Sequence, residues 1–313
     1  MEKLIVSSSP HIHKKTSTAT IMADVIIALA PATIASVILF GVSALIRILV
    51  CVAAAVASEY LFNLICKKPQ TITDLSAIVT GLLLAFSLPA KTEIYYCALG
   101  AVFAIVVVKC LFGGIGCNFA NPAVTARIML FIAFSSSVGG GSATNFQSAD
   151  LAAGATPLEI IKLSSDKALP SLLDMFLGNR AGALGETCVL ALVIGGIYLI
   201  VRKVIHWELP VIYLATVFLL SLAIKQDPII ALYELLGGGA VIAAFFMITD
   251  YVSTPINRLG KMVFAFGCAL FTVIFRFFSS YPEGVSFAIL LMNILAPYIE
   301  KLCERAPFGK VGK

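Results

Sequence analysis

The chain has 313 residues, of which 60% are hydrophobic and 12% charged, and its formal net charge is +5. Soluble domains carry about 25% charged residues, so this composition excludes an ordinary soluble protein and predicts a polytopic membrane protein embedded in a lipid bilayer. The positive residues cluster between apolar runs, where they set topology, and we therefore expect no nucleic-acid partner.

Apolar runs along the chain predict ten helices. A bilayer core needs about 20 apolar residues per crossing helix, and several runs approach that length. Gly237-Gly238-Gly239 lies inside the eighth predicted helix and indicates a break there, because glycine destabilises a helix interior. The predicted helices cover residues 21–41, 45–66, 75–88, 94–111, 122–136, 184–203, 209–224, 229–249, 261–278 and 284–302.

These helices fall into two groups of five, separated by a long polar loop. An odd number of helices per group places the groups in opposite orientations, as in transporters with inverted repeats. The expected fold class is therefore all-α, polytopic, with about ten transmembrane helices in a 5+5 inverted repeat with broken helices. The expected parts are an N-terminal segment (1–20), a first half (21–136), a loop (137–183), a second half (184–302) and a tail (303–313).

The distribution of basic residues predicts the orientation. Most of the 22 lysines and arginines fall in segments on the same side as both termini. Positively charged segments stay in the cytoplasm, so we expect both termini there and the loop 137–183 outside. The N-terminus has no basic head followed by a short apolar run, and no removable signal peptide is predicted.

The stretch around Thr156 is the main candidate site in the loop. Gly154 and Pro157 suit a turn, and Thr156, Pro157 and Glu159 have the spacing of a capped helix start. A hydroxyl on an exposed turn is also a suitable attachment point for a covalent group. The residues alone leave both interpretations open.

Two polar turns between apolar helices form a second candidate site. Gly114 and Gly116 allow close approach of a flat ligand, and Asn118 and Asn121 supply donors and acceptors. A re-entrant turn with capping asparagines is the alternative for this segment. Asp250 lies in the second turn, Thr249–Pro255, and polar backbone near lipid usually lines a cavity. Asp74, at another helix end, is expected to be a helix cap.

Other kinds of site lack support. The eight cysteines form no CxxC pair, and we expect no metal or cluster held by this chain alone. The sequence contains no phosphate-binding loop, dinucleotide-binding glycine pattern or nucleophile elbow, so no catalytic residue is assigned.

Several motifs, taken together, resemble the RnfD family, the membrane flavin subunits of the ion-translocating Rnf complex, which are paralogous to the B subunit of the sodium-pumping NADH:quinone reductase. The resemblance covers nearly the whole chain. Three residues depart from the family pattern: Ala120 stands where Phe is usual, Ala153 where Ser or Thr is usual, and Tyr251 where Pro is usual. The matching motifs are Ser8-Ser-Pro-His11, Thr73-Asp74 with Ser76-Ala77 and Val79–Leu84, Gly113–Asn118, Asn121-Pro-Ala123, Gly154–Leu158 and Thr249-Asp250.

The resemblance implies a covalent cofactor in the loop. Family members carry FMN through a phosphoester to the threonine of a motif matched here by Asp150, Gly154, Ala155 and Thr156, and a flavin transferase installs it from FAD. Lys162, Lys167 and Arg180 share the loop and are expected to neutralise the phosphate. A second, noncovalent flavin (riboflavin) is also implied, and its candidate ligands are Gly114, Gly116, Asn118, Asn121, Thr249 and Asp250.

The implied function is electron transfer in a membrane enzyme complex. The chain would be a subunit of a ferredoxin:NAD oxidoreductase that pumps Na⁺ or H⁺ across the bacterial cytoplasmic membrane, with other Rnf subunits supplying iron–sulfur clusters, a further flavin and the NADH site. Two alternatives remain: the B subunit of a sodium-pumping NADH:quinone reductase, and a stand-alone permease or channel for a small solute.

Overall fold

The computed structural model describes residues 17–139, 141–142, 144, 156–163, 169–279 and 283–304. Within these ranges the secondary structure is helical, apart from two isolated antiparallel bridges that join Pro89 to Ala183 and Ser142 to Gly182. The expected all-helical membrane fold is therefore confirmed. The N-terminal segment and the C-terminal tail lie largely outside the described residues.

The first half follows the predicted helices closely. Helices α1 and α2 are separated by Gly41, whose φ of 69° ends one helix and starts the next. The N-cap position of α3 is Leu75, and Asp74 lies one residue before it. Asp74 still satisfies a free N–H at this helix start, because its Oδ1 accepts the Ser76 backbone N–H at 2.9 Å. The elements are α1 (Thr18–Phe40), α2 (Val42–Ile65), η1 (Ile72–Asp74), α3 (Ser76–Ser87), α4 (Ile94–Phe103) with its π-helical continuation η2 (Ala104–Cys110), α5 (Pro122–Ala133) and α6 (Ser135–Val138).

The second half contains one correction to the predicted boundaries. The helix expected over 184–203 begins at Val189, because Leu184 and Gly185 donate their backbone N–H groups to Leu88 and Phe86 at the end of α3. The elements are α7 (Pro157–Lys162), α8 (Leu172–Leu177), α9 (Val189–Val201), α10 (Glu208–Lys225), α11 (Pro228–Leu236), α12 (Ala240–Ile242) with the π-helical η3 (Ala243–Met247), α13 (Arg258–Phe278) and α14 (Val285–Leu302).

Helix length divides the described helices into two kinds. Five of them, α1, α2, α10, α13 and α14, are long and apolar enough to cross a membrane, and the bent pair α11 and α12–η3 makes a sixth candidate. The shorter apolar helices include α3 and α5, whose 12 residues span only about 18 Å. A hydrocarbon core is about 30 Å thick, so the ten predicted helices are not ten complete spans.

The outer surface of the bundle is apolar. Ile27, Ile34 and Ile38 share one face of α1, and each is at least 54% exposed. Large exposed apolar side chains on long helices are expected where a helix faces lipid.

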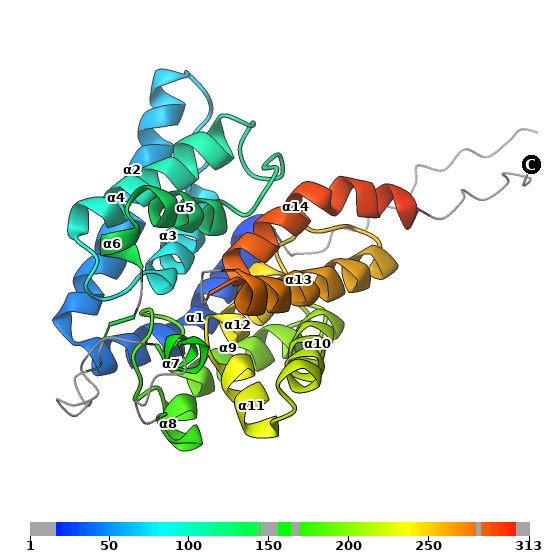
Figure 1. Cartoon of the computed structure of the whole chain (residues 1–313). Coiled ribbons are helices and arrows are strands. Elements are labelled where there is room, and N and C mark those ends of the chain that lie inside the picture. The colour runs from blue at the N-terminus through cyan, green and yellow to red at the C-terminus, as the bar shows by residue number, and fades with distance from the viewer. Residues whose placement is uncertain are drawn as a thin grey trace, which may run out of the picture.

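Helix α1 connects the two halves of the chain. In Figure 1 it runs between the group α2 to α6 and the helices α9 to α12. Its contact with α9 is close: a Cβ added at Gly195 would lie 2.0 Å from the Ala28 carbonyl oxygen. Small residues permit such approach between membrane helices.

Two helices start from a left-handed residue inside the bundle. Leu75 precedes α3 with φ 63° and ψ 3°, and Gly239 precedes α12 with φ 70° and ψ 13°. The break predicted at Gly237-Gly238-Gly239 is confirmed, since α11 and the α12–η3 helix are bent by 62°. Broken helices leave backbone groups without helical partners, and such groups must be satisfied inside the protein.

Candidate functional site

Thr156 begins α7, as the spacing of the loop predicted. Its side-chain oxygen accepts the Glu159 backbone N–H at 3.3 Å, and the Glu159 carboxylate accepts the Thr156 backbone N–H at 2.7 Å. Pro157 occupies the first helical position. This reciprocal pair fixes the orientation of the hydroxyl.

The surroundings of Thr156 differ from the exposed turn that was expected. The residue is only 4% exposed. Gly141 lies against it, and a Cβ added at Gly141 would be 2.9 Å from Thr156 Cγ2 and 2.9 Å from the Gly182 nitrogen. Gly141 belongs to the same loop but lies outside the 154–159 stretch, so the local spacing of that stretch does not reveal the burial. The other motif positions, Asp150, Gly154 and Ala155, lie outside the described residues.

The basic residues expected to neutralise a phosphate at Thr156 have other partners. Lys162 donates to the carbonyls of Arg276 and Ser279, and Arg180 donates to those of Glu186 and Leu236. Desolvation lowers the pKa of Lys162 and of Arg180. The third residue, Lys167, lies outside the described part of the chain. Lys162 and Arg180 are therefore held by backbone carbonyls in this structure, and their expected role in neutralising a phosphate at Thr156 stays a prediction.

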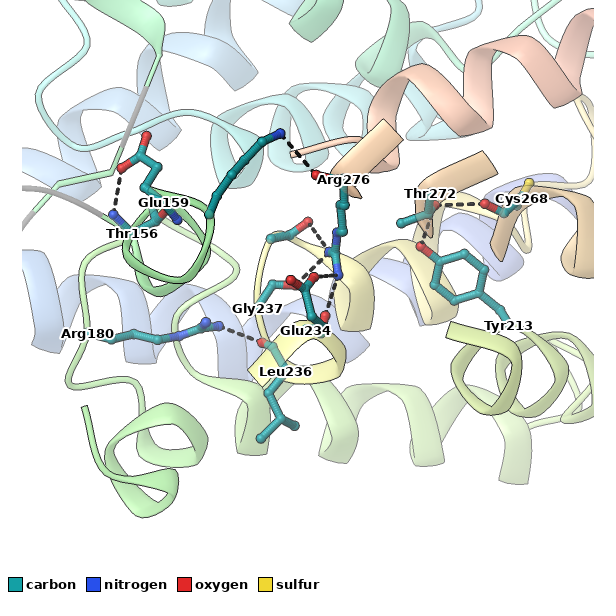
Figure 2. A network of polar contacts seen from close by, with 12 residues as sticks. Thr156, Glu159, Arg180, Tyr213, Glu234, Leu236, Gly237, Cys268, Thr272 and Arg276 are labelled. Atoms are coloured by element: carbon teal, nitrogen blue, oxygen red, sulfur yellow. Dashed lines mark hydrogen bonds and ion pairs between the residues drawn. The ribbon is translucent and has the colours of Figure 1, made fainter. Parts of the chain in front are cut away.

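A buried arginine closes the break in the α11–α12 span. Arg276 forms an ion pair with Glu234 at 3.1 Å and also donates to the carbonyls of Gly237 and Gly238, at 3.0 and 3.3 Å (Figure 2). Both side chains of the ion pair are at least 94% buried. The guanidinium thus satisfies carbonyls that the broken helix leaves without partners.

Helix α7 packs on this same break. A Cβ at Gly238 would lie 2.4 Å from Leu158 Cδ1, and one at Gly237 would lie 3.2 Å from Leu158 Cγ. Leu158 is two residues from Thr156, so the loop helix and the broken membrane helix form one packed unit. Figure 2 shows Thr156 and Glu159 beside the Arg276 network.

The second candidate site is a pocket between the two halves. It contains about 730 Å³ not occupied by atoms, part of which is open to the surface. Its polar lining residues are Ser76, Thr80, Lys109, Asn118, Asn121, Thr249, Asp250 and Tyr251, and its apolar lining includes Val79, Leu83, Phe245 and Phe246.

The pocket brings together four of the six residues predicted for this site. Asn118 and Asn121 come from one turn, and Thr249 and Asp250 from the other. The predicted Gly114 and Gly116 are not among the lining residues. Both have left-handed φ values, 98° and 93°, which explains why the turn contains glycine at these positions.

Two asparagines in the first turn have different roles. The Asn121 side chain accepts the backbone N–H groups of Ala123 and Val124, so it caps α5 as the alternative interpretation proposed. Asn118 Oδ1 is buried in the pocket wall without a hydrogen-bond partner in the described structure. Buried acceptors are normally satisfied, so this oxygen fits a donor supplied by a ligand.

The second turn is held by internal hydrogen bonds. The Asp250 carboxylate accepts the Ser253 hydroxyl at 2.9 Å, and Thr249 donates its hydroxyl to the Phe245 carbonyl at 2.7 Å. Burial raises the pKa of Asp250, although hydrogen bonds from Ser253 and the backbone oppose this change. Burial also raises the pKa of Tyr251, to about 12.

Asn293 joins the two turns, which the sequence did not indicate. In the amide orientation that satisfies both neighbours, its nitrogen donates to the Ser253 carbonyl at 3.1 Å and its oxygen accepts the Asn121 backbone N–H at 3.0 Å. Asn293 is buried in α14. The sequence feature that could have indicated this role is a single asparagine inside an otherwise apolar predicted helix.

One lining residue of the pocket, Lys109, belongs to a buried ion pair. Lys109, at the end of η2, bonds to Glu59 Oε1 at 2.8 Å and to the Ser76 hydroxyl at 2.6 Å. Both charged side chains are at least 97% buried. Thr71 donates a further hydrogen bond to Glu59 Oε1 at 2.6 Å. The topology rule treated Lys109 only as a cytoplasmic charge and did not predict this pair.

Comparison with known proteins covers nearly the whole chain. The profile of the NQR2, RnfD, RnfE family matches residues 5–309. The chain is 44% identical to the D subunit of the Na⁺-translocating ferredoxin:NAD⁺ oxidoreductase complex of Acetobacterium woodii, covering 98% of this chain and 95% of that protein.

Two further relatives are also D subunits. The chain is 39% identical to the D subunit of the proton-translocating ferredoxin:NAD⁺ oxidoreductase complex of Clostridium ljungdahlii, covering 97% of this chain and 96% of that protein. It is 34% identical to the D subunit of an ion-translocating oxidoreductase complex of Stutzerimonas stutzeri, covering 95% of this chain and 93% of that protein. The chain is therefore a member of the NQR2, RnfD, RnfE family and within it is similar to D subunits.

Proposed function

We propose that this protein is the D subunit of an ion-translocating ferredoxin:NAD⁺ oxidoreductase complex in a bacterial cytoplasmic membrane. The observation that carries the proposal is the 44% identity to such a subunit over 98% of the chain. The named relatives belong to one complex that translocates Na⁺ and another that translocates protons. The coupled ion of this protein is accordingly Na⁺ or H⁺, and its partners are the remaining subunits of the complex.

The proposed role is electron transfer through a flavin held at Thr156. In the attachment step the Thr156 oxygen attacks the FMN phosphorus of FAD, the phosphoanhydride bond breaks, and AMP leaves. A bound flavin exchanges one or two electrons and so connects carriers of either kind. The α7 capping pair supports this role, because it fixes the position of the attachment atom on a helix packed against the membrane domain.

Attachment requires local opening of the loop. Thr156 is 4% exposed, and its oxygen caps α7. A transferase therefore acts on a conformation in which the start of α7 is released, and Asp150, Gly154 and Ala155 form the motif that it binds. Esterification replaces the hydroxyl hydrogen by phosphorus and weakens the oxygen as an acceptor for the Glu159 N–H. The family resemblance favours the ester over a permanent cap.

We propose the pocket between the halves as the site of a noncovalent flavin. Its aromatic and aliphatic lining and the unpartnered Asn118 oxygen fit a flat ring with hydrogen-bonding edges. Phe245 and Phe246 provide apolar surface, and Thr249 and Asp250 provide polar groups at the second turn.

We also propose the 5+5 inverted arrangement with both termini in the cytoplasm. Leu75 is the first residue of the third predicted helix of the first half, and Gly239 lies within the third predicted helix of the second half. Both residues have a left-handed backbone and start a helix, which supports the repeat. Three basic residues are buried and are therefore poor signals of topology: Lys109, Arg180 and Arg276. They are divided between the predicted cytoplasmic and external sides. Leaving them out still leaves an excess of lysine and arginine on the cytoplasmic side.

Flavin attachment is tested by co-expressing the chain with a flavin transferase and viewing a denaturing gel under ultraviolet light. We expect a fluorescent band for the wild type and for Thr144→Ala, a control in the same loop, and no band for Thr156→Ala. Mass spectrometry of the Thr156 peptide should show the mass of FMN less one water. A fluorescent Thr156→Ala band, or a dark wild-type band with active transferase, would contradict the assignment.

A further inference from the structure

Two buried ion pairs occupy comparable places in the two halves. Lys109 lies at the C-terminal end of the α4–η2 helix and pairs with Glu59, and Arg276 lies near the C-terminal end of α13 and pairs with Glu234. Each basic side chain also bonds to an interruption in a helix. Lys109 contacts Ser76, which follows the left-handed Leu75, and Arg276 contacts the carbonyls of the Gly237-Gly238 break.

The two pairs differ in where their remaining donors lie. The terminal nitrogens of Arg276 bond to the carboxylate and carbonyl of Glu234 and to two glycine carbonyls, and its Nε is buried without a partner among the described residues, away from the pocket lining. An ammonium group has three donors, and Lys109 uses two of them, on Glu59 and Ser76, among the residues that the structure describes. Lys109 lines the pocket, whereas Arg276 does not.

The hydrogen bonds around Lys109 fix the ammonium in place. Glu59 Oε1 accepts from both Lys109 and Thr71, and Ser76 donates its own hydroxyl to Asp74 Oδ1 at 2.5 Å. The ammonium therefore lies in a preorganised position, where its interaction with a new negative charge in the pocket is stronger than in water. Two other titratable groups, Asp250 and Tyr251, also line the pocket, and neither is a cation, so Lys109 is the cationic residue of the described lining.

We propose that Lys109 is the residue that binds the electron-rich carbonyl edge of the flat redox-active ring in this pocket and stabilises the ring after reduction. The proposal rests on the noncovalent flavin of the proposed function. Lys109 donates its third N–H to a ring oxygen or nitrogen. A flavin bound here would take one electron from the reduced-ferredoxin side of the complex and pass it to the next carrier. The Lys109 ammonium, held by Glu59, would stabilise the added negative charge through its N–H group.

The decisive variant removes both charges of the pair. Lys109→Met alone would leave Glu59 as an uncompensated buried charge and would disturb folding, whereas replacing both partners by neutral groups is often tolerated. The test therefore uses Glu59→Gln with Lys109→Met. Its control is Glu208→Gln with Arg258→Met, an ion pair between α10 and α13 that does not line the pocket. Lys109→Arg preserves the charge.

Two quantities are measured on the purified complex: acid-extractable flavin relative to covalent flavin, and the midpoint potential of the extractable flavin in situ. In the neutral double variant we expect tenfold weaker retention of extractable flavin, or a midpoint potential lower by about 59 mV, the one-electron equivalent of a tenfold change. Covalent flavin should be unchanged. The control pair should match the wild type, and Lys109→Arg should retain most of the extractable flavin.

The outcomes separate this inference from the function on which it rests. Unchanged retention and unchanged potential in the neutral double variant overturn the role of Lys109 and leave the pocket flavin in place. A wild-type complex without extractable flavin overturns both the pocket flavin and the role of Lys109. Equal losses in the double variant and the control also overturn the role, because they reveal a general loss of structure.

Discussion

Leu158 packs directly on Gly238, so that a Cβ added at Gly238 would lie 2.4 Å from Leu158 Cδ1. Leu158 belongs to the short helix that Thr156 begins, and Gly238 lies in the break between α11 and α12. The proposed cofactor attachment point is thus connected to the bent membrane helix through the packing of Leu158 on the break. A change in packing on either side is felt on the other, because protein interiors are close-packed.

Gly238→Ala should destabilise the protein. The position has a φ of 57°, and the added methyl would also lie 2.7 Å from an Arg276 terminal nitrogen. Left-handed backbone costs a non-glycine residue about 1–2 kcal/mol, and overpacking adds about 1–3 kcal/mol. Thermal unfolding in detergent measures the loss. Adding Leu158→Ala relieves the clash, so the two effects should be less than additive; additivity within about 0.5 kcal/mol would rule out the contact.

Arg276→Met should be severely destabilising. It leaves the buried Glu234 carboxylate without its cation and the Gly237 and Gly238 carbonyls without donors. Breaking a buried pair in this way typically costs about 3–5 kcal/mol. The matched control is Arg202→Met, because Arg202 is 56% exposed and its pair with Asp24 is screened by water. Similar unfolding temperatures for the two variants would contradict a locking role for Arg276.

Glu283 should make stability depend on pH. Burial raises the pKa of its carboxyl from about 4.5 to about 7, even though Arg127 beside it favours the charged form. Between pH 4.5 and pH 7 the Glu283 carboxyl holds a proton in the folded protein but releases it in the unfolded chain. The contribution of Glu283 to stability is therefore largest below pH 4.5 and falls as the pH rises to 7. Glu283→Gln removes this decline. Unfolding temperatures of both proteins at pH 5 and pH 8 provide the measurement, and parallel changes would refute the assignment.

Local chemistry made much of the fold predictable. Proline, glycine and capping residues marked the helix ends, so the cap at Thr156 and the break at Gly237-Gly238-Gly239 were both found from spacing. The predicted turns at 113–122 and 249–255 also meet at one pocket. These features depend on residues close together in the chain, which is the range that spacing describes.

Long-range polar partners were not predictable in the same way. Lys109 and Glu59 are 50 positions apart, and Arg276 and Glu234 are 42 apart. Each lies alone in an apolar run, where a topology rule treats it as a side marker rather than as half of an ion pair. The burial of Thr156 was missed for a related reason, since its neighbour Gly141 lies outside the short stretch whose spacing predicted the cap.

Asn293→Leu should loosen the pocket by separating its two turns. The substitution keeps side-chain size but removes the amide that bonds to the Asn121 N–H and the Ser253 carbonyl. Leaving buried backbone groups without partners costs about 1–3 kcal/mol, and the turns should then lose register around the pocket. We expect less extractable flavin per covalent flavin, together with a lower unfolding temperature. Met292→Leu, a volume-conserving change one residue away, should alter neither quantity much. A normal flavin ratio in Asn293→Leu, despite lower stability, would show that Asn293 supports the fold but does not shape the pocket.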